Sequence, residues 1–362
     1  MSERIRLIED LDRGAIPESP RAFLEALEGP SAILVPGRER NRCRAVCTLL
    51  HGNEPSGLMA LHGWLREDAP PAFDCLILIA AVETALEPPG FAHRFLPTAR
   101  DLNRCFLPPF EGPEGELAGE ILRLVREANP ECLIDLHNNT GHNPPYGVGP
   151  VAGAAELNLV GLFSERFVHS PLRLGALVEA TQDDFPSVTV ECGRAGDLAA
   201  DAAARRGLDR YLAGEEIDPH HVTTPHMSVL TNPLRVCVRP DVEIDFADQP
   251  GNETDFTVVG DVDRHNFESL LPGVPIGWVR DETLWPLELL DIDGKDRSRD
   301  YFTLRGRRLE TRRTIIPIMM TTCAGAAKSD CLFYVVEPGE EIVVEPGEEI
   351  VAEPEKEPNH GE

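Results

Sequence analysis

The sequence has few lysines, no C-x-x-C pair and no apolar segment long enough to cross a membrane. Only three of its 34 basic residues are lysines, and 62 acidic residues bring the formal net charge to −28. Because so acidic a surface has no basic patch to displace the counterions of DNA or RNA, we do not expect nucleic-acid binding. The longest apolar run, Cys75–Val82, is too short for a transmembrane helix, so we expect no membrane partner either.

The nine cysteines are scattered, odd in number and nowhere arranged as C-x-x-C. The first residues, MSERIRLIEDLDRG, are charged and lack the apolar core of a secretory signal. This combination predicts free thiols and excludes a zinc finger built from thiolates. We expect a cytoplasmic protein that acts on a small-molecule substrate, and a homo-oligomer is compatible with the sequence.

Residues 1–222 alternate apolar, β-rich runs with amphipathic, helix-like stretches. Near-continuous apolar strands that alternate with helices predict an α/β sheet covered on both faces. The predicted strands are Ser31–Gly37, Arg44–Gly52, Asp74–Val82, Pro130–Asn138 and Pro186–Gly193. The predicted helices are Ser56–Glu67, Gly115–Ala128 and Asp197–Ala213.

The remaining chain has a different texture. Residues 223–343 are strand-like, with Pro, Gly and Asp between the runs and little helical periodicity, so we predict a second, smaller, mainly β domain there. The sequence VVEPGEEI then occurs twice in tandem. Residues 344–362 are rich in Glu and Pro and cannot bury much apolar surface, which predicts a solvated, disordered acidic tail.

The first chemical motif, LLHGNEPSG, places His51 and Glu54 at a predicted strand-to-helix turn. A catalytic zinc site takes three ligands from histidines and carboxylates and keeps one position for water, and this pair can converge on such a metal. Taken alone, the pair is also explained by a turn histidine beside a glutamate that complements a helix dipole.

The second motif, ECLIDLHNNTG, places Asp135 and His137 at the end of another buried strand, two residues apart and therefore on one face. Ligands of open α/β sheets bind beyond the carboxyl ends of the strands, so His137 is the expected third metal ligand. Asp135 either orients a histidine as a supporting carboxylate or is a hydrogen-bonded strand-end residue without a catalytic role.

A third buried strand ends in Glu191, within SVTVECG. A carboxylate at such a position is costly unless it is paired or used, and a zinc hydrolase needs a general base to take a proton from metal-bound water. We predict that role for Glu191. The neighbouring Cys192 could act as a thiol nucleophile, but the pattern favours a small buried hydrophobe.

Several arginines crowd the segment HRFLPTARDLNRCF, which contains Arg94, Arg100, Asn103 and Arg104. Arginine binds carboxylates in bidentate fashion and can stabilise an oxyanion. An arginine-rich loop of an acidic protein is also commonly a surface ion-pair region of little energetic worth.

The motifs HGNEPSG, DLNR, DLHNNTG and VTVECG, in this order, resemble those of the succinylglutamate desuccinylase/aspartoacylase family, a branch of the zinc carboxypeptidase-like hydrolases. The resemblance implies a carboxypeptidase-like mixed β-sheet covered by helices on both faces, with a smaller C-terminal β domain. It also implies one Zn²⁺ per chain, with His51, Glu54 and His137 as ligands and Glu191 as the general base.

By the same resemblance, Asn103 and Arg104 grip a substrate carboxylate, and an arginine shortly before them polarises the scissile carbonyl. The segment before the pair is longer than the family's usual form, so Arg94 is preferred and Arg100 is the alternative. Tyr146 is the tyrosine best placed to bind substrate, unless it is a loop aromatic that packs on its neighbours. The implied activity is deacylation of a small N-acyl amino acid; a carboxypeptidase, an esterase and a non-catalytic binding protein are the alternatives.

Overall fold

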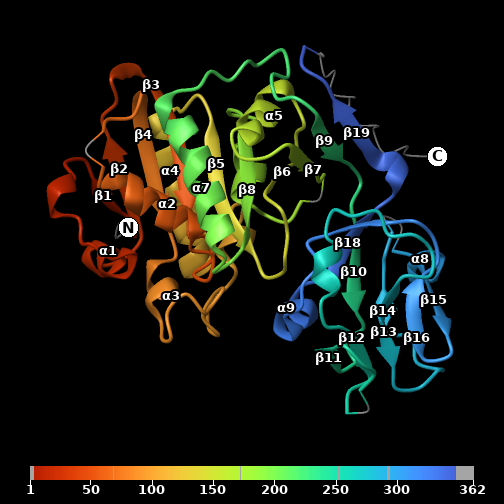
Figure 1. Ribbon diagram of the computed structural model, residues 1–362. Helices are drawn as coiled ribbons and strands as arrows, with labels where there is room; N and C mark the ends of the chain where they lie inside the picture. Colours follow the sequence, from red (N-terminus) through yellow and green to blue (C-terminus); the bar gives the residue numbers. More distant parts are fainter. Residues whose placement is uncertain (1–3, 68, 172, 252, 292–293, 348–362) are drawn as a thin grey trace, which may run out of the picture.

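The computed structural model describes residues 4–67, 69–171, 173–251, 253–291 and 294–347. Its largest element is a ten-stranded mixed sheet with the order β1-β2-β4-β3-β5-β8-β6-β7-β9-β19 (Figure 1). Two smaller sheets lie beyond the β9–β19 end of it. The described part of the chain contains no helix that is long and apolar enough to span a bilayer.

All five strands predicted from apolar runs are found in the large sheet. Its central strands β3, β5 and β8 run parallel, whereas β6 pairs antiparallel with β8. The strands of this sheet are β1 (Arg6–Ile8), β2 (Ser31–Val35), β3 (Glu39–Thr48), β4 (Phe73–Ile79), β5 (Leu133–Asn139), β6 (Tyr146–Gly149), β7 (Arg166–His169), β8 (Ser187–Arg194), β9 (Met227–Leu230) and β19 (Glu341–Val344).

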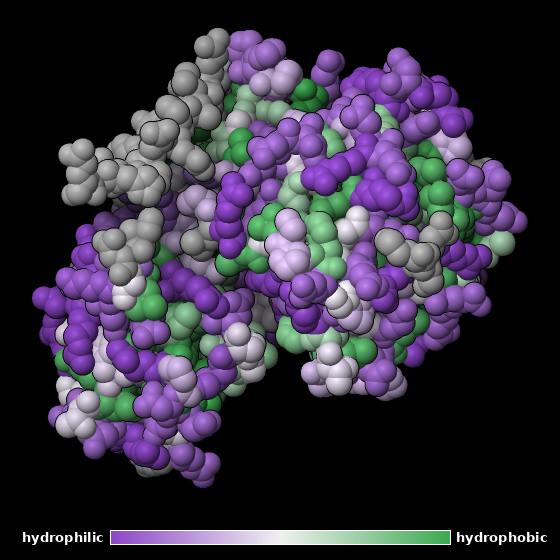
Figure 2. All heavy atoms as spheres, turned by 180° about the vertical axis from the view of Figure 1, so that it is seen from behind, coloured by the Kyte–Doolittle hydropathy of each residue, from purple (hydrophilic) through white to green (hydrophobic). Residues whose placement is uncertain are grey.

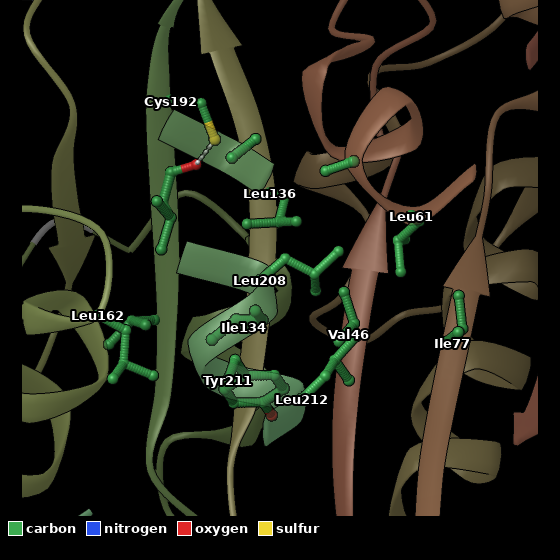
Figure 3. Packing of buried hydrophobic residues seen from close by; sticks show 14 of the residues in the cluster. Val46, Leu61, Ile77, Ile134, Leu136, Leu162, Cys192, Leu208, Tyr211 and Leu212 are labelled. Atoms are coloured by element: carbon green, nitrogen blue, oxygen red, sulfur yellow. Dashed lines mark hydrogen bonds between the residues drawn. The ribbon is translucent and has the colours of Figure 1, made fainter. Parts of the chain in front are cut away.

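Helices cover both faces of the large sheet. One face packs against α1 (Pro20–Leu27), α2 (Ser56–Leu65), α3 (Val82–Leu86), α5 (Ala154–Gly161) and α7 (Leu198–Ala213). Figure 3 shows this core, in which Val46 and Ile134 of the strands face Leu208 of α7. The other face packs against α4 (Gly112–Ala128) and α6 (Leu177–Thr181).

Local signals set the ends of these helices. The hydroxyl of Ser19 accepts a hydrogen bond from the amide of Ala22 (3.1 Å), and Pro20 opens α1 with its φ already suited to a helix. Asn129 (φ 43°) ends α4 and Gly214 (φ 85°) ends α7, both in the left-handed conformation that stops a helix.

The C-terminal region contains two sheets around a core of its own, which includes Val236, Phe256 and Phe333. The four-stranded sheet has the order β14 (Leu287–Glu288), β10 (Leu234–Val238), β18 (Phe333–Val336) and β17 (Ile316–Ile318). The five-stranded sheet has the order β11 (Ile244–Ala247), β12 (Phe256–Val259), β13 (Pro275–Val279), β16 (Arg308–Thr311) and β15 (Phe302–Arg305). The short helices of this region are α8 (Ser298–Tyr301) and α9 (Ala324–Ser329). Seen from behind, the region forms a lobe beside the large sheet, and most of the visible surface is hydrophilic (Figure 2).

The boundary between the two regions differs from the one expected at residues 222 and 343. The apolar run around Asn232 forms two strands in different sheets, because Asn232 has a positive φ of 52° and Pro233 has no N–H to donate to a ladder. The strand-like segment that contains Pro338 also forms two strands in different sheets, with β18 before the proline and β19 after it. Since β9 and β19 pair in the large sheet, the C-terminal region comprises the residues between them. Residues 348–362 of the expected tail lie outside the described residues.

Candidate metal centre

His51 and Glu54 lie in the turn that joins β3 to α2. Leu49 has a positive φ of 55°, which turns the chain out of the strand direction. A Cβ atom at Gly52 would lie 2.7 Å from the backbone nitrogen of Ala85, so only glycine allows this close approach. The amide of Gly52 also donates to the carbonyl of Arg94 (3.1 Å), which ties this turn to the arginine-bearing segment.

His51, Glu54 and His137 converge at the carboxyl edge of the large sheet. His137 lies near the end of β5, which runs parallel to β3, so the ends of the two strands meet. One ligand atom from each of the three residues lies within 4.8 Å of the other two. All three side chains are buried. The three donors are therefore spaced to hold one metal ion.

The two histidines turn the same ring nitrogen toward Glu54. The Nδ1 atom of His51 lies 2.9 Å from one carboxylate oxygen, and the Nδ1 atom of His137 lies 2.7 Å from the other. The 2.9 Å contact of His51 does not have hydrogen-bond geometry, so its buried Nδ1 has no hydrogen-bond partner among the described residues. Such an unpaired buried atom is costly, and an ion between the three donors would satisfy it. Two imidazoles and a carboxylate are a donor set that suits Zn²⁺.

An aspartate holds the opposite nitrogen of each histidine. The Nε2 atom of His137 lies 2.7 Å from Asp135, and the Nε2 atom of His51 lies 2.9 Å from Asp101. These carboxylates favour the tautomer that leaves Nδ1 free to bind a metal. The contact supports the orienting role of Asp135. Sequence reasoning assigned nothing to Asp101, although the residue belongs to the DLNR motif.

The carboxylates around the centre are held in their ionised form. Burial by itself would raise the pKa of Glu54, but His51 and His137 outweigh burial and place that pKa well below its ordinary value. Burial also opposes ionisation of Asp101, but the hydrogen bond and charge of His51, together with Arg94, lower its pKa. Ionised carboxylates at this position favour a bound cation.

Glu191 lies in β8 beside the metal donors. The strand register places it opposite His137 of β5 on one side and Tyr146 of β6 on the other. Burial raises the pKa of Glu191 to about 7, although nearby His137 acts in the opposite direction. A carboxyl group with a pKa near neutrality can both accept and return a proton. The side-chain amide of Asn139 donates to Glu191 (2.8 Å) and to the hydroxyl of Tyr146 (3.1 Å).

Of the two alternative arginines, only Arg94 reaches the metal centre. Arg94 donates to Glu54 and to Asp101, each at 3.0 Å. Arg100 instead donates to the carbonyl of Glu111 on the exposed surface. Of the two, Arg94 is therefore the arginine that lies beside the three metal donors.

A cavity of about 790 Å³ opens beside the three donors. Arg94, Asn103, Arg104 and Glu191 all border it, so the structure brings these sequence-predicted residues to the same space as the donors. Asn103 is held in place because its side-chain oxygen accepts a hydrogen bond from the amide of Leu177 (3.0 Å).

The C-terminal region supplies the opposite wall of this cavity. Arg235 of β10, Tyr334 of β18 and Ile318 of β17 form one row across the four-stranded sheet, and all three line the cavity. Arg235 forms an ion pair with Asp330. Sequence reasoning missed this wall because no motif marks it and its position depends on how the two regions pack.

Tyr146 does not line the cavity, in contrast to the substrate contact expected from the sequence. Its side chain is fully buried, and its ring lies 4.8 Å from the ring of Phe267 in the C-terminal region. With its hydroxyl bonded to Asn139, Tyr146 is a packed residue next to Glu191, which agrees with the alternative of an aromatic that packs on its neighbours.

Cys192 faces away from the cavity. Its thiol lies in the helix-covered core and donates to the carbonyl of Val190 (3.8 Å; Figure 3). Burial raises the pKa of this thiol far above its ordinary value. A protonated, inaccessible thiol cannot act as a nucleophile, so the thiol-hydrolase alternative is excluded.

Comparison with known proteins agrees with the resemblance seen in the motifs. Residues 45–213 match the family model of the succinylglutamate desuccinylase/aspartoacylase catalytic domain. No curated protein sequence matches the chain significantly.

Three solved structures illustrate the shared fold. The succinylglutamate desuccinylase/aspartoacylase from Rhodobacter sphaeroides is 15% identical, with 87% of this chain and 88% of that one covered and a TM-score of 0.52. Murine aminoacylase 3 is 20% identical, with 85% and 98% covered and a TM-score of 0.53. The succinylglutamate desuccinylase from Vibrio cholerae is 15% identical, with 89% and 99% covered and a TM-score of 0.51. The resemblance to the succinylglutamate desuccinylase/aspartoacylase family is therefore confirmed, and it rests on a catalytic domain at residues 45–213.

Proposed function

We propose that this protein is a zinc-dependent hydrolase that cleaves the amide bond of a small N-acyl amino acid or a related carboxylate-bearing substrate. The convergence of His51, Glu54 and His137 beside Glu191 carries the proposal. These residues border a cavity that also presents Asn103 and Arg104. The match of residues 45–213 to the family's catalytic domain supports a hydrolase, and the similar solved structures are named as desuccinylases, an aspartoacylase and an aminoacylase.

His51, Glu54 and His137 would hold one Zn²⁺ per chain, the two histidines through Nδ1. The orphaned Nδ1 of His51 and the aspartates behind both rings fit this assignment. When bound, the ion lowers the pKa of a water molecule and polarises a carbonyl oxygen.

Protein side chains carry the remaining steps. Glu191 accepts a proton from the attacking water and returns it to the leaving nitrogen, two roles for which a pKa near neutrality is suited. The guanidinium of Arg94 stabilises the negative charge that develops on the carbonyl oxygen. Asn103 and Arg104 orient the substrate carboxylate and so fix the amide against the reacting groups.

A substrate panel tests this proposal. Zinc-loaded protein is incubated with N-acetyl, N-succinyl and longer N-acyl amino acids, with peptides of increasing length and with the matching esters. We expect turnover of short N-acyl amino acids, loss of turnover on chelation and recovery when Zn²⁺ is returned.

The rival functions give different results in the same panel. A carboxypeptidase would release C-terminal residues from the longer peptides, and an esterase would cleave the esters but not the amides. A binding protein would leave every compound intact although fully loaded with zinc, which would overturn the proposal.

A further inference from the structure

The loop at residues 140–145 joins β5 to β6 and connects the metal centre to the C-terminal region. It follows Asn139 directly and leads into Tyr146. Asn139 bonds both Glu191 and Tyr146 through its side-chain amide. The loop therefore begins directly after the residue whose side-chain amide contacts the carboxylate of Glu191.

Two side chains of the C-terminal region hold the centre of this loop. Asp263, in the 3₁₀-helix Val262–His265, accepts a hydrogen bond from the amide of His142 (2.9 Å). Asn266 donates to the carbonyl of His142 (2.9 Å). Asn266 also pairs with the backbone of Met320, accepting at 2.8 Å and donating at 3.0 Å. The side chain of Asn266 thus links the loop to the segment around Met320 by hydrogen bonds.

The segment around Met320 contacts the loop at further points. The side-chain oxygen of Asn143 accepts from the amide of Met319 (3.2 Å). The hydroxyls of Thr140 and Thr321 lie 2.7 Å apart. Together with Asp263 and Asn266, these contacts attach three of the six loop residues (140, 142 and 143) by hydrogen bonds.

The packing leaves the loop little freedom. A Cβ atom at Gly141 would lie 2.0 Å from the carbonyl oxygen of Met320, so the two backbones meet at a distance that only glycine allows. Asp263 is 2% exposed and Asn266 is 6% exposed. Buried polar groups are costly unless they are bonded, and here they are bonded to the loop. Phe267 adds the ring contact to Tyr146.

We propose that Asp263 and Asn266 are positioning residues for the general base. They hold loop 140–145 and, through it, the Asn139 amide that orients Glu191. A general base works only with its oxygen in hydrogen-bond reach of the water it deprotonates, and a displacement of about 1 Å can cost about 100-fold in rate. By this proposal the C-terminal region contributes to the rate of the reaction and not only to the stability of the fold. This inference rests on the proposed hydrolase function.

The test compares Asp263→Ala and Asn266→Ala with the conservative Asp263→Asn, which keeps an acceptor for the His142 amide. Ser298→Ala is the matched control, because Ser298 is fully buried in the same region and accepts from Trp285 (2.8 Å) without contacting the loop. Zinc content, melting temperature, kcat and KM are measured on a substrate that the wild type turns over.

Both alanine variants should lose about 10- to 100-fold in kcat, with KM within about twofold and zinc content unchanged. Asp263→Asn and Ser298→Ala should keep kcat within about threefold. Alanine variants that lose only thermal stability, or that raise KM with kcat intact, would overturn the proposal. If the alanine variants do not fold, Thr321→Val against Thr321→Ser gives a milder comparison, in which only the valine should lower kcat.

A readout that does not need activity separates this inference from the proposed function. In a crystal structure of Asn266→Ala, the 2.8 Å contact between Asn139 and Glu191 should be broken. An unchanged contact would refute the positioning role, whatever the substrate is. A wild-type protein that turns over no substrate would refute the proposed function but would leave this structural outcome to be judged separately.

Discussion

Replacement of Asp135 by asparagine should weaken metal binding without dismantling the metal centre. Asp135 is fully buried, and its carboxylate lies 2.7 Å from the Nε2 atom of His137. The carboxylate keeps the proton on Nε2 and so leaves Nδ1 free for a metal. An asparagine can instead donate to Nε2 through its amide, which favours the wrong tautomer.

The expected loss follows from this geometry. Replacing the outer partner of a metal-binding histidine typically costs about 10- to 100-fold in metal affinity, or about 1.4 to 2.8 kcal/mol. Asp135 is inaccessible to water that could take its place as the partner of Nε2, so the loss of metal affinity in Asp135→Asn should lie near the upper end of this range. Asp101 is 15% exposed and shared between His51 and Arg94, so Asp101→Asn should lose less.

The assay is competition for Zn²⁺ against a chelator of known affinity, with the melting temperature of each apoprotein recorded. Ser187→Ala, which removes a buried hydroxyl from β8 away from the donors, controls for general damage to the sheet. A folded Asp135→Asn protein with the zinc affinity of the wild type would show that the orienting role is wrong, as would a larger loss for Asp101→Asn.

Three further predictions concern the base, the pH profile and the core. Glu191→Gln should retain zinc and lose about 10²- to 10⁴-fold in kcat. The control Glu156→Gln, at a buried glutamate of α5, should keep its activity. A wild-type kcat in Glu191→Gln would contradict the role of general base. The general base must be ionised, and burial raises the pKa of Glu191. We therefore expect kcat/KM to fall about tenfold per pH unit on the acid side of a midpoint that lies between pH 4.5 and about 7. A midpoint below pH 4.5 would contradict this prediction. Arg44→Met should lower the free energy of unfolding, measured in urea, by about 3 kcal/mol. The reason is that the buried Arg44 pairs with Glu131 and donates to two backbone carbonyls. A loss of less than about 1 kcal/mol would contradict this prediction.

The parts predicted well from the sequence are those that depend on local patterns. Apolar runs mark the central strands, and His137 and Glu191 each stand near the end of one. Because parallel strands end at the same edge, motifs far apart in the sequence can be placed together from the strand pattern alone. The large mixed sheet with helices on both faces is confirmed. The catalytic roles of these residues stay predictions.

The parts that were missed depend on packing between distant segments. For Tyr146 the sequence leaves open whether the ring contacts substrate or packs on its neighbours, and its contact with Phe267 depends on the packing of the two regions. Arg235 and Tyr334 belong to strands of another sheet and line the cavity only because the two regions pack together. The division of an apolar run at Asn232 depends on one backbone angle, which periodicity does not reveal.

The decisive experiment for a zinc-dependent deacylase is the hydrolysis of N-acyl amino acids by protein with a measured zinc content. We expect one zinc per chain and turnover of at least one short N-acyl amino acid, lost on chelation and restored by Zn²⁺. Zinc-loaded protein that leaves the whole panel intact, or turnover that survives complete removal of the metal, would contradict the proposed function.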